Sequence, residues 1–549
     1  MKYGVWTSVL AFFLTLAGWA QVSTPARRSP AVDTQIVFVG LHHPVSTANS
    51  EAQRQFDLGL GLIYALDFSG AAKSFQRAAT LDPNLAMAYW GISYAAGSDY
   101  YYHTAGSPAR EQAAGEALQN ALALSERATP AERAYITALS KRYCNCPNPN
   151  RKQQAIEFKD AMAELSRSHP DDLDAATLYA QSIMNLSPGW LWNVDGTPWQ
   201  GTPEVLSILE SVLKRNPRHI GAAHYYIHAV EGSPHPERAL AYAKELPSLA
   251  PSIGHIVHMP AHIFIRTGDY ALAEDACIKA ENVDNRSMEE SARPEMFTVL
   301  SFLHDLYFLA AAASMDGHYR IARDAADKLA NEIRPHLEDM PELQAFVPVQ
   351  MAVLARFHQW SAILQIPEPD AHFKVSSAFW HFTRGTAFAA TRKLNDAERE
   401  QQVVGTMAEA TPPEEILAMT PNHARDVLEI AFHVLSAKLA AARHENSEAI
   451  SHLREAVAIQ DQLHYSEPPS WFYPVRESLG AMLTRDGQTR EAEQVFREDL
   501  RRNPRNPRSL YGLLQTLGSI GDPKEEKLLQ DQLSMAWKGD RQQLNLRDF

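Results

Sequence analysis

One glutamate and a run of histidines are spaced so that their side chains share faces of predicted helices. His224, His228 and Glu231 are separated by four and three residues, and side chains at these spacings lie on one side of an α-helix. The next predicted helix carries three more imidazoles, at His255, His258 and His262. Neutral imidazoles together with a carboxylate suit zinc, copper, iron or nickel. The pattern therefore predicts a transition-metal site, with zinc or copper as the expected ion.

Neighbouring residues extend this site. Packed helices lie about 8–10 Å apart and zinc–nitrogen bonds measure about 2.0–2.1 Å, so imidazoles from adjacent helices can meet at one ion. The helix after these offers His304 as a further candidate ligand and Tyr307 as a candidate ligand contact. Glu231 is interpreted as a metal ligand, as an acceptor that orients a histidine ring, or as a catalytic general base beside metal-bound water.

The same histidines are also compatible with functions that need no metal. Imidazoles in a groove can bind an acidic peptide and titrate together, and buried imidazoles can donate hydrogen bonds to main-chain carbonyls. The spacing is not His-Glu-x-x-His, so the helix signature of the common zinc peptidases is absent from these two segments.

A repeated pattern of small and large residues indicates which elements position these side chains. Near the N-terminus the pattern consists of Leu58, Gly59, Leu62, Ala71, Phe75, Ala78 and Pro83. It recurs near the C-terminus with Gly480, Phe496 and Pro504, and Pro217 and Pro251 mark one full register in between. These offsets are typical of a helix-turn-helix repeat of about 34 residues. The sequence therefore predicts an all-α solenoid of the tetratricopeptide-repeat (TPR) type, a right-handed superhelix whose first helices line a concave groove. In this register the histidines point into the groove.

Composition shifts along the chain predict its organisation. Lys2, the apolar run from Val5 to Leu16 and the small residues Gly18 and Ala20 have the layout of a secretory signal peptide. An uncleaved N-terminal anchor is the alternative. The expected segments are a signal peptide at 1–20, a polar lead-in at 21–50, an N-terminal array at 51–366 with a tryptophan-rich insertion at 187–202, a break at 367–374, a C-terminal array at 375–540 and a tail at 541–549. We accordingly expect an exported protein, periplasmic or secreted, without a membrane span once the signal is removed.

Charge and cysteine usage exclude some partners and some kinds of fold. The net charge of -14 argues against nucleic acid as a partner. The chain has three cysteines, Cys144, Cys146 and Cys277, too few to hold together a chain of this length. Packing must therefore stabilise the fold, and we expect Cys277 to be a buried free thiol.

Two aromatic loops are candidate ligand contacts. Trp190 and Trp192 lie in the insertion, which Pro and Gly residues keep from being helical throughout and which could act as a lid. Glu467 and Trp471 lie in a proline-rich segment, residues 465–474. This second loop either covers the groove and contacts a ligand, or packs Trp471 against the last repeats.

The chain resembles a bacterial family of exported TPR proteins. The resemblance rests on His43-Pro44-Val-Ser-Thr, on Tyr225 to Glu231, on His258-Met-Pro-Ala-His262 and on Glu467-Pro-Pro. It implies the repeat fold and export, and it implies no particular activity. The chain departs from the family pattern at Gln181 and Ser182, where an acidic residue is usual, and at Asp305, where asparagine is expected.

Two functions of different classes follow from these observations. The first is an exported scaffold that binds an unidentified protein, peptide or small ligand in its concave groove and carries a histidine-rich metal site. The alternative is a metal-dependent hydrolase or oxidoreductase built on the same solenoid. Fold alone does not decide between them.

Overall fold

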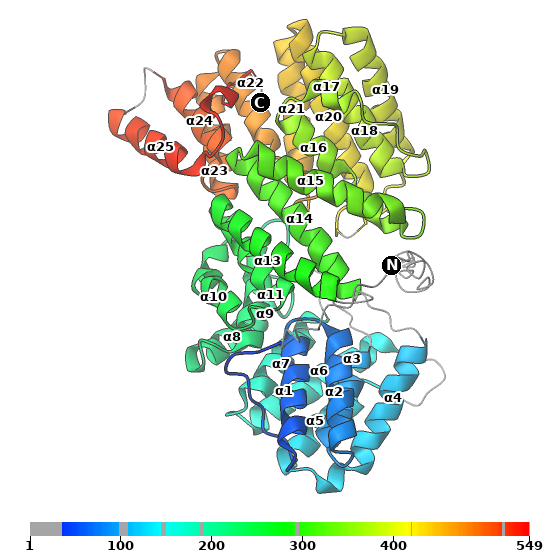
Figure 1. The fold of residues 1–549 in the computed structure, drawn as a ribbon. Coiled ribbons are helices and arrows are strands. Elements are labelled where there is room, and N and C mark those ends of the chain that lie inside the picture. Colours follow the sequence, from blue (N-terminus) through cyan, green and yellow to red (C-terminus); the bar gives the residue numbers. More distant parts are fainter. Residues whose placement is uncertain are drawn as a thin grey trace. The chain divides into compact units, whose positions relative to one another are not determined.

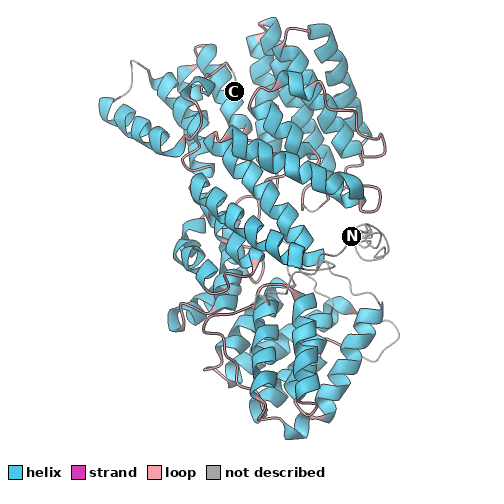
Figure 2. Cartoon of the chain, viewed as in Figure 1, coloured by secondary structure: helices cyan, strands magenta, loops and turns pink. Residues whose placement is uncertain are grey.

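The computed structural model describes residues 36–97, 108–143, 150–186, 191–290, 296–418, 420–518, 522–547 and 549. Within these residues helices and their connecting loops make up the chain, and no strand is formed (Figure 2). Two isolated bridges, Trp192 with Pro198 and Ile416 with His423, are the β-type pairings there. The predicted all-α class is confirmed.

The chain divides into two compact units. The first comprises residues 1–260 and 282–301, and the second comprises residues 261–281 and 302–549. The helices α13 (Tyr270–Glu290) and α14 (Met296–Asp316) contribute to both units.

The first unit contains the helices from α1 to α11 (Figure 1). Their bounds are α1 (Ser50–Tyr64), α2 (Phe68–Leu81), α3 (Ala86–Ala96), α4 (Pro108–Ala123), α5 (Pro130–Ser140), α6 (Arg151–Ser168), α7 (Leu173–Met184), α8 (Thr202–Arg215), α9 (Ile220–Glu231), α10 (Leu240–Glu245) and α11 (Gly254–His258).

The second unit takes in most of α12 and the helices from α15 onward. Their bounds are α12 (Pro260–Thr267), α15 (Tyr319–Ile333), α16 (Pro348–Arg356), α17 (Trp360–Ile363), α18 (Lys374–Ala390), α19 (Leu394–Ala410), α20 (Ala424–Arg443), α21 (Asn446–Gln460), α22 (Val475–Arg485), α23 (Thr489–Arg502), α24 (Pro507–Leu517) and α25 (Pro523–Ala536).

Consecutive helices pack as hairpins, and glycines at the crossings let a phenylalanine fill the space between them. Phe75 on α2 is fully buried against Gly59 on α1 and Gly91 on α3, where an added Cβ would lie within 2.7 Å and 2.3 Å of its ring. Phe496 on α23 is buried in the same way between Gly480 and Gly512. This arrangement is the TPR-type packing that the repeat pattern predicts. At least seven hairpins are expected, and the described residues contain eight: α1 with α2, α3 with α4, α5 with α6, α7 with α8, α18 with α19, α20 with α21, α22 with α23 and α24 with α25.

The predicted break at 367–374 does not separate two compact units. The segment is an irregular connection between α17 and α18, but Met351 on α16 shares one apolar cluster with Val375 and Phe379 on α18. The core therefore continues past this connection, and the two compact units divide near residue 260 instead.

Two further expectations concern α14 and Cys277. The helix α14 is long and apolar enough to cross a membrane, with a mean hydropathy of 1.4 over Phe297–Asp316. However, 67% of this stretch is buried inside the structure, and core helices of soluble proteins have the same length and hydropathy. Cys277 is a buried free thiol, as predicted. Burial raises the pKa of this thiol well above its usual value. Cys144 and Cys146, like the predicted signal peptide, lie outside the described residues.

The glycine–phenylalanine packing predicts a large difference between two glycine substitutions. Gly480→Val should lower the free energy of unfolding by about 1–3 kcal/mol because the added side chain overpacks the Phe496 contact. The control is Gly115→Ala on α4, where an added Cβ has no atom within 4 Å and the higher helix propensity of alanine should stabilise by about 0.5–1 kcal/mol. Urea unfolding followed by circular dichroism measures both. Equal stability of the two variants would contradict the packing account.

Candidate metal centre

The helix α9, which carries His224, His228 and Glu231, is buried along its whole length. It packs against α1, because Gly221 gives room for the ring of Tyr64: a Cβ at Gly221 would lie 2.4 Å from that ring. Tyr64 is the last residue of α1, so its main-chain carbonyl is one of the four at a helix C-terminus that lack an intrahelical partner. The nitrogen Nδ1 of His224 lies 2.6 Å from this carbonyl oxygen.

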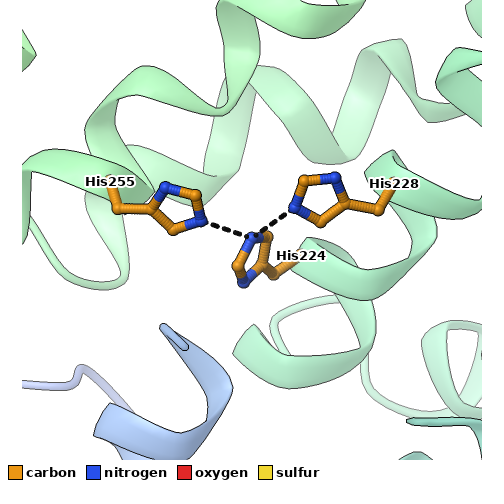
Figure 3. Close-up of side chains that lie close together, drawn as sticks. All are labelled: His224, His228 and His255. Carbon is orange, nitrogen blue, oxygen red and sulfur yellow. Dashed lines mark hydrogen bonds between the residues drawn. The ribbon is translucent and has the colours of Figure 1, made fainter. Parts of the chain in front are cut away.

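Three imidazoles of the first unit meet at their Nε2 atoms, and we call His224, His228 and His255 the histidine triad (Figure 3). Nε2 of His224 lies 3.1 Å from Nε2 of His228 and 3.1 Å from Nε2 of His255. All three ligand atoms lie within 4.8 Å of one another. The two residues on α9 are buried and His255, on α11, is partly exposed. The structure thus brings together three of the predicted ligands, from two helices.

The hydrogen bonds of the triad fix where its protons lie. A carbonyl oxygen only accepts, so His224 must carry its proton on Nδ1, and Nε2 of the neutral ring is then a bare acceptor. Nδ1 of His228 lies 2.8 Å from Oε1 of Glu231, so an ionised Glu231 places the proton of His228 on Nδ1 as well. Two lone pairs therefore face each other across 3.1 Å. With Glu231 ionised, a cation, either an additional proton or a metal ion, makes this contact favourable.

The predicted roles of Glu231 and Trp192 can now be compared with their positions. The Oε1 atom of Glu231 accepts from Nδ1 of His228, on the opposite edge of the ring from Nε2. This is the position of an acceptor that orients a ligand histidine. The indole of Trp192 donates to the carbonyl of Ala229, at 2.8 Å, so the insertion is attached to α9 beside the triad. Trp190 lies outside the described residues.

A second polar network holds α9 and α1 together and was not expected from the sequence. Asp174, in the first turn of α7, accepts from the Tyr64 hydroxyl at 2.5 Å and lies 2.8 Å from Nδ1 of His43 and 3.3 Å from Nε2 of His219. His219 caps the N-terminus of α9, where its Nδ1 accepts from the amide of Ala222. We call this the Asp174 network. It fixes both the helix that carries the triad and the residue that receives the hydrogen bond of His224.

Further hydrogen bonds attach the polar lead-in to the helices of the first unit. The amide of His43 donates to Asp57, the amide of Ser46 to Glu132, and the hydroxyl of Thr47 to Asp82. A cavity of ≈ 390 Å³ lies against this segment and Asp174. His43 belongs to the segments that carry the family resemblance. Its contact with Asp174 could not be predicted from the sequence, because the two residues are 131 positions apart.

Charge complementarity decides the pKa values in this network. Burial alone would lower the pKa of His43, but the hydrogen bond and charge of Asp174, with the charges of Asp172 and Asp57, raise it above 6.5. Burial would raise the pKa of Asp174, but the hydrogen bonds and charges of His219 and His43 lower it far below 3.8. At neutral pH Asp174 is therefore a partly buried carboxylate beside a histidine with an increased proton affinity.

The remaining candidate residues have other surroundings. His258 is fully buried at the end of α11 in the first unit. In the second unit, Nδ1 of His262 lies 2.7 Å from Oε2 of Glu467, and the rings of His262 and His304 both pack against Phe308.

The proline-rich loop in the second unit is partly a core element. Trp471 is 7% exposed and packs against Phe379 and Phe382. Trp471 therefore packs against repeat helices, as in the second interpretation of the loop, and it also lines the cavity beside the loop. Tyr307 stacks on Phe472. The loop also borders a cavity of ≈ 160 Å³, lined in part by Glu467.

Comparisons with known proteins assign neither a family nor an activity to the chain. No protein-family model and no curated protein sequence matches the chain. Among solved structures it is similar to yeast Tom70, with 10% identity over 89% of each chain and a TM-score of 0.28. It is also similar to the P58(IPK) TPR domain, with 13% identity over 82% of this chain and 99% of that one and a TM-score of 0.22. A third is the human IFIT1 dimer with m7Gppp-AAAA, with 12% identity, coverages of 88% and 94%, and a TM-score of 0.34.

These similarities are too weak to transfer a ligand or partner. All three TM-scores are 0.34 or lower, so the helical hairpins described above are the evidence for the fold. The assignment of this chain to the TPR-type fold rests on those hairpins and their glycine–phenylalanine packing.

The Asp174 network predicts a pH-dependent stability. Asp174→Asn should lower the free energy of unfolding by about 3 kcal/mol, because it leaves buried partners of a charged group without their counter-charge. The lowered pKa of Asp174 makes its contribution complete above pH 3.8 and lost as the pH falls below it. The raised pKa of His43 makes its contribution complete below pH 6.5 and lost as the pH rises through the folded-state value.

The difference between wild type and Asp174→Asn should therefore be largest between about pH 4 and pH 6.5. Urea unfolding across pH 3–9 measures it. Asp171→Asn is the control, because the Asp171 side chain is 100% exposed and pairs with Arg215 at the surface. A difference that does not vary with pH would contradict the charge account.

Proposed function

We propose that the protein is an exported TPR-type scaffold that binds a transition-metal ion at the histidine triad. The observation that carries the proposal is the contact between Nε2 of His224 and Nε2 of His228, two atoms that both lack a proton when the rings are neutral. A metal ion between such nitrogens turns an unfavourable contact into coordinate bonds.

The spacing of the triad supports this assignment. Metal–nitrogen bonds of about 2.0–2.1 Å in a tetrahedral site separate the ligand nitrogens by about 3.3–3.4 Å. Two of the three separations are 3.1 Å and the third is no more than 4.8 Å, so small ring movements would bring the three nitrogens to the distances that an ion needs. Imidazole ligands suit zinc and copper, the two ions expected from the sequence. Glu231, behind His228, would orient the ring and increase its basicity.

The position of the triad at the end of α1 supports a positive charge there. The carbonyl of Tyr64 belongs to the C-terminal turn of α1, where the helix dipole is negative. It accepts from His224, so charge that develops on this ring is stabilised. The helix dipole therefore favours the binding of a cation at the triad.

Export and a groove partner complete the proposal. The N-terminal pattern of Lys2, an apolar run and small residues supports export to the periplasm or beyond. TPR-type arrays commonly present concave surfaces to partners, so the expected ligand is a protein, a peptide or a small molecule. The net charge of -14 disfavours nucleic acid.

Metal content of substituted proteins tests the triad. Protein purified without chelator and dialysed against zinc should hold zinc close to stoichiometry, and His255→Ala should weaken its binding at least tenfold because one of three nitrogens is lost. His255 is partly exposed and lies outside the helix α9, so helical content should not change. Binding should also weaken below about pH 6, where protons compete for imidazole.

The matched control is His235→Ala, because the His235 side chain is 69% exposed and pairs with Glu237 away from the triad. It should retain full zinc binding. Zinc affinity of His255→Ala equal to that of the control would show that the triad is held together by a shared proton and would reject the metal proposal.

A metal-dependent enzyme is the second candidate, and one observation favours it. Three imidazoles with a carboxylate behind one of them are the donor set of many catalytic zinc sites, which keep a fourth position for water or substrate. Zinc-loaded protein would then hydrolyse an activated ester such as 4-nitrophenyl acetate, and Glu231→Gln would lower the rate at least tenfold together with zinc affinity. If fully zinc-loaded protein hydrolyses the ester no faster than His255→Ala, the enzyme candidate is wrong and only the scaffold function remains.

A further inference from the structure

A pair of buried carboxyl groups lies at the C-terminal end of α14, in the second unit. Asp316 is the last residue of α14 and is 1% exposed. Glu274, on α13, is 4% exposed. Together with His318, at the start of α15, each offers a ligand atom within 4.8 Å of the other two. We call these three residues the carboxyl cluster.

The hydrogen-bond donors around the cluster do not reach all of its carboxyl oxygens. Nδ1 of His318 lies 2.8 Å and 3.1 Å from the two oxygens of Glu274. The main-chain amide of His318 donates to Oδ1 of Asp316 at 3.3 Å. Oδ2 of Asp316 is buried without a hydrogen-bond partner among the described residues. A buried acceptor in this state costs about 1–3 kcal/mol, and more when it is charged.

The surroundings make a cation more favourable than in an ordinary acidic cluster. Asp316 ends a helix of 21 residues, so the negative end of the helix dipole adds to its own charge. The two carboxyl groups also hydrogen-bond to each other, so a bound cation would displace the proton that they share. The charge of Lys538 also acts on Glu274, while its ammonium donates a hydrogen bond to the carbonyl of Met535.

The C-terminal segment covers this place, which separates it from bulk water. The ring of Trp537 lies against Gly317, where an added Cβ would be 2.5 Å from it. The amide of Lys538 donates to the carbonyl of Asp316 at 2.7 Å. The side chain of His318 is 36% exposed and gives solvent access to the cluster.

We propose that Glu274, Asp316 and His318 bind a divalent cation, Mn²⁺ or Zn²⁺, at the turn between α14 and α15. Carboxylates favour hard cations such as Mn²⁺, whereas imidazole favours Zn²⁺, and the mixed donor set suits both. The ion neutralises the two carboxylates, gives Oδ2 of Asp316 a partner and joins α13 to the turn. This site is independent of the histidine triad and of the function proposed for it.

Manganese binding in a His255→Ala background tests the proposal, because this change removes the triad as a competing site. Titration with MnCl₂ followed by electron paramagnetic resonance should show one bound Mn²⁺ per chain, and the midpoint of thermal unfolding should rise with added Mn²⁺. Asp316→Asn should abolish both effects, and His318→Ala should weaken binding at least tenfold.

The matched control is Asp275→Asn, which changes a carboxylate next to Glu274 that is 58% exposed and pairs with Lys279. It should leave Mn²⁺ binding unchanged. Circular dichroism of Asp316→Asn confirms folding, and His318→Ala provides a second, milder variant. No bound Mn²⁺ or Zn²⁺ in the background protein, or equal binding in Asp316→Asn, would overturn the proposal and leave a carboxyl pair that shares a proton.

The two metal proposals fail separately. The zinc titration that tests the triad is repeated in an Asp316→Asn background, which removes the carboxyl cluster as a competing zinc site, whereas the carboxyl cluster is tested in the His255→Ala background. A protein that binds Mn²⁺ in the His255→Ala background but loses zinc at the triad would support both assignments. Loss of Mn²⁺ binding alone would leave the triad unaffected.

Discussion

The hydrogen bond from Nδ1 of His224 to the main-chain carbonyl of Tyr64 is the interaction on which the site depends. Because a carbonyl cannot donate, this bond decides which nitrogen of His224 carries the proton. The free edge of the ring is then directed at two other imidazoles (Figure 3). The contact between His224 and His228, unfavourable when both Nε2 atoms lack a proton, becomes favourable once a cation is present.

Helix packing places this bond, and small residues make the packing possible. Gly221 lets the ring of Tyr64 lie against α9, just as Gly59 and Gly91 admit Phe75 between the first hairpins. Asp174 then connects the Tyr64 hydroxyl to His219 at the N-terminus of α9. The geometry of the triad therefore results from repeat packing combined with a polar network that repeat packing alone does not require. That network stabilises the first unit and positions the ligands at the same time.

The repeat pattern predicted the fold because its glycines and phenylalanines act locally. Phe75 and Phe496 lie one helix away from the glycines that they contact, so their offsets are visible in the sequence. The histidine triad could be grouped for a similar reason. His224 and His228 share one face of α9, and His255 lies on α11, where the repeat register predicts the next helix that lines the groove. Helical periodicity is enough to find contacts of this range.

Contacts between distant segments could not be predicted in this way. His43 and Asp174 are separated by 131 residues, and no periodicity connects a polar lead-in to the first turn of α7. Glu274 and Asp316 occupy ordinary polar positions of two helices, and their burial depends on the C-terminal residues that cover Gly317. The division of the chain near residue 260 likewise reflects which cores are continuous, whereas the sequence showed a proline-rich connection at 367–374.

The central claim is that a metal ion, and not a proton, holds the three Nε2 atoms together. Crystals of the protein grown with one equivalent of zinc, with diffraction recorded on both sides of the zinc absorption edge, test it most directly. The account predicts an anomalous peak about 2.0–2.1 Å from Nε2 of His224, His228 and His255. Well-ordered rings at their present separations with no anomalous peak between them would contradict it.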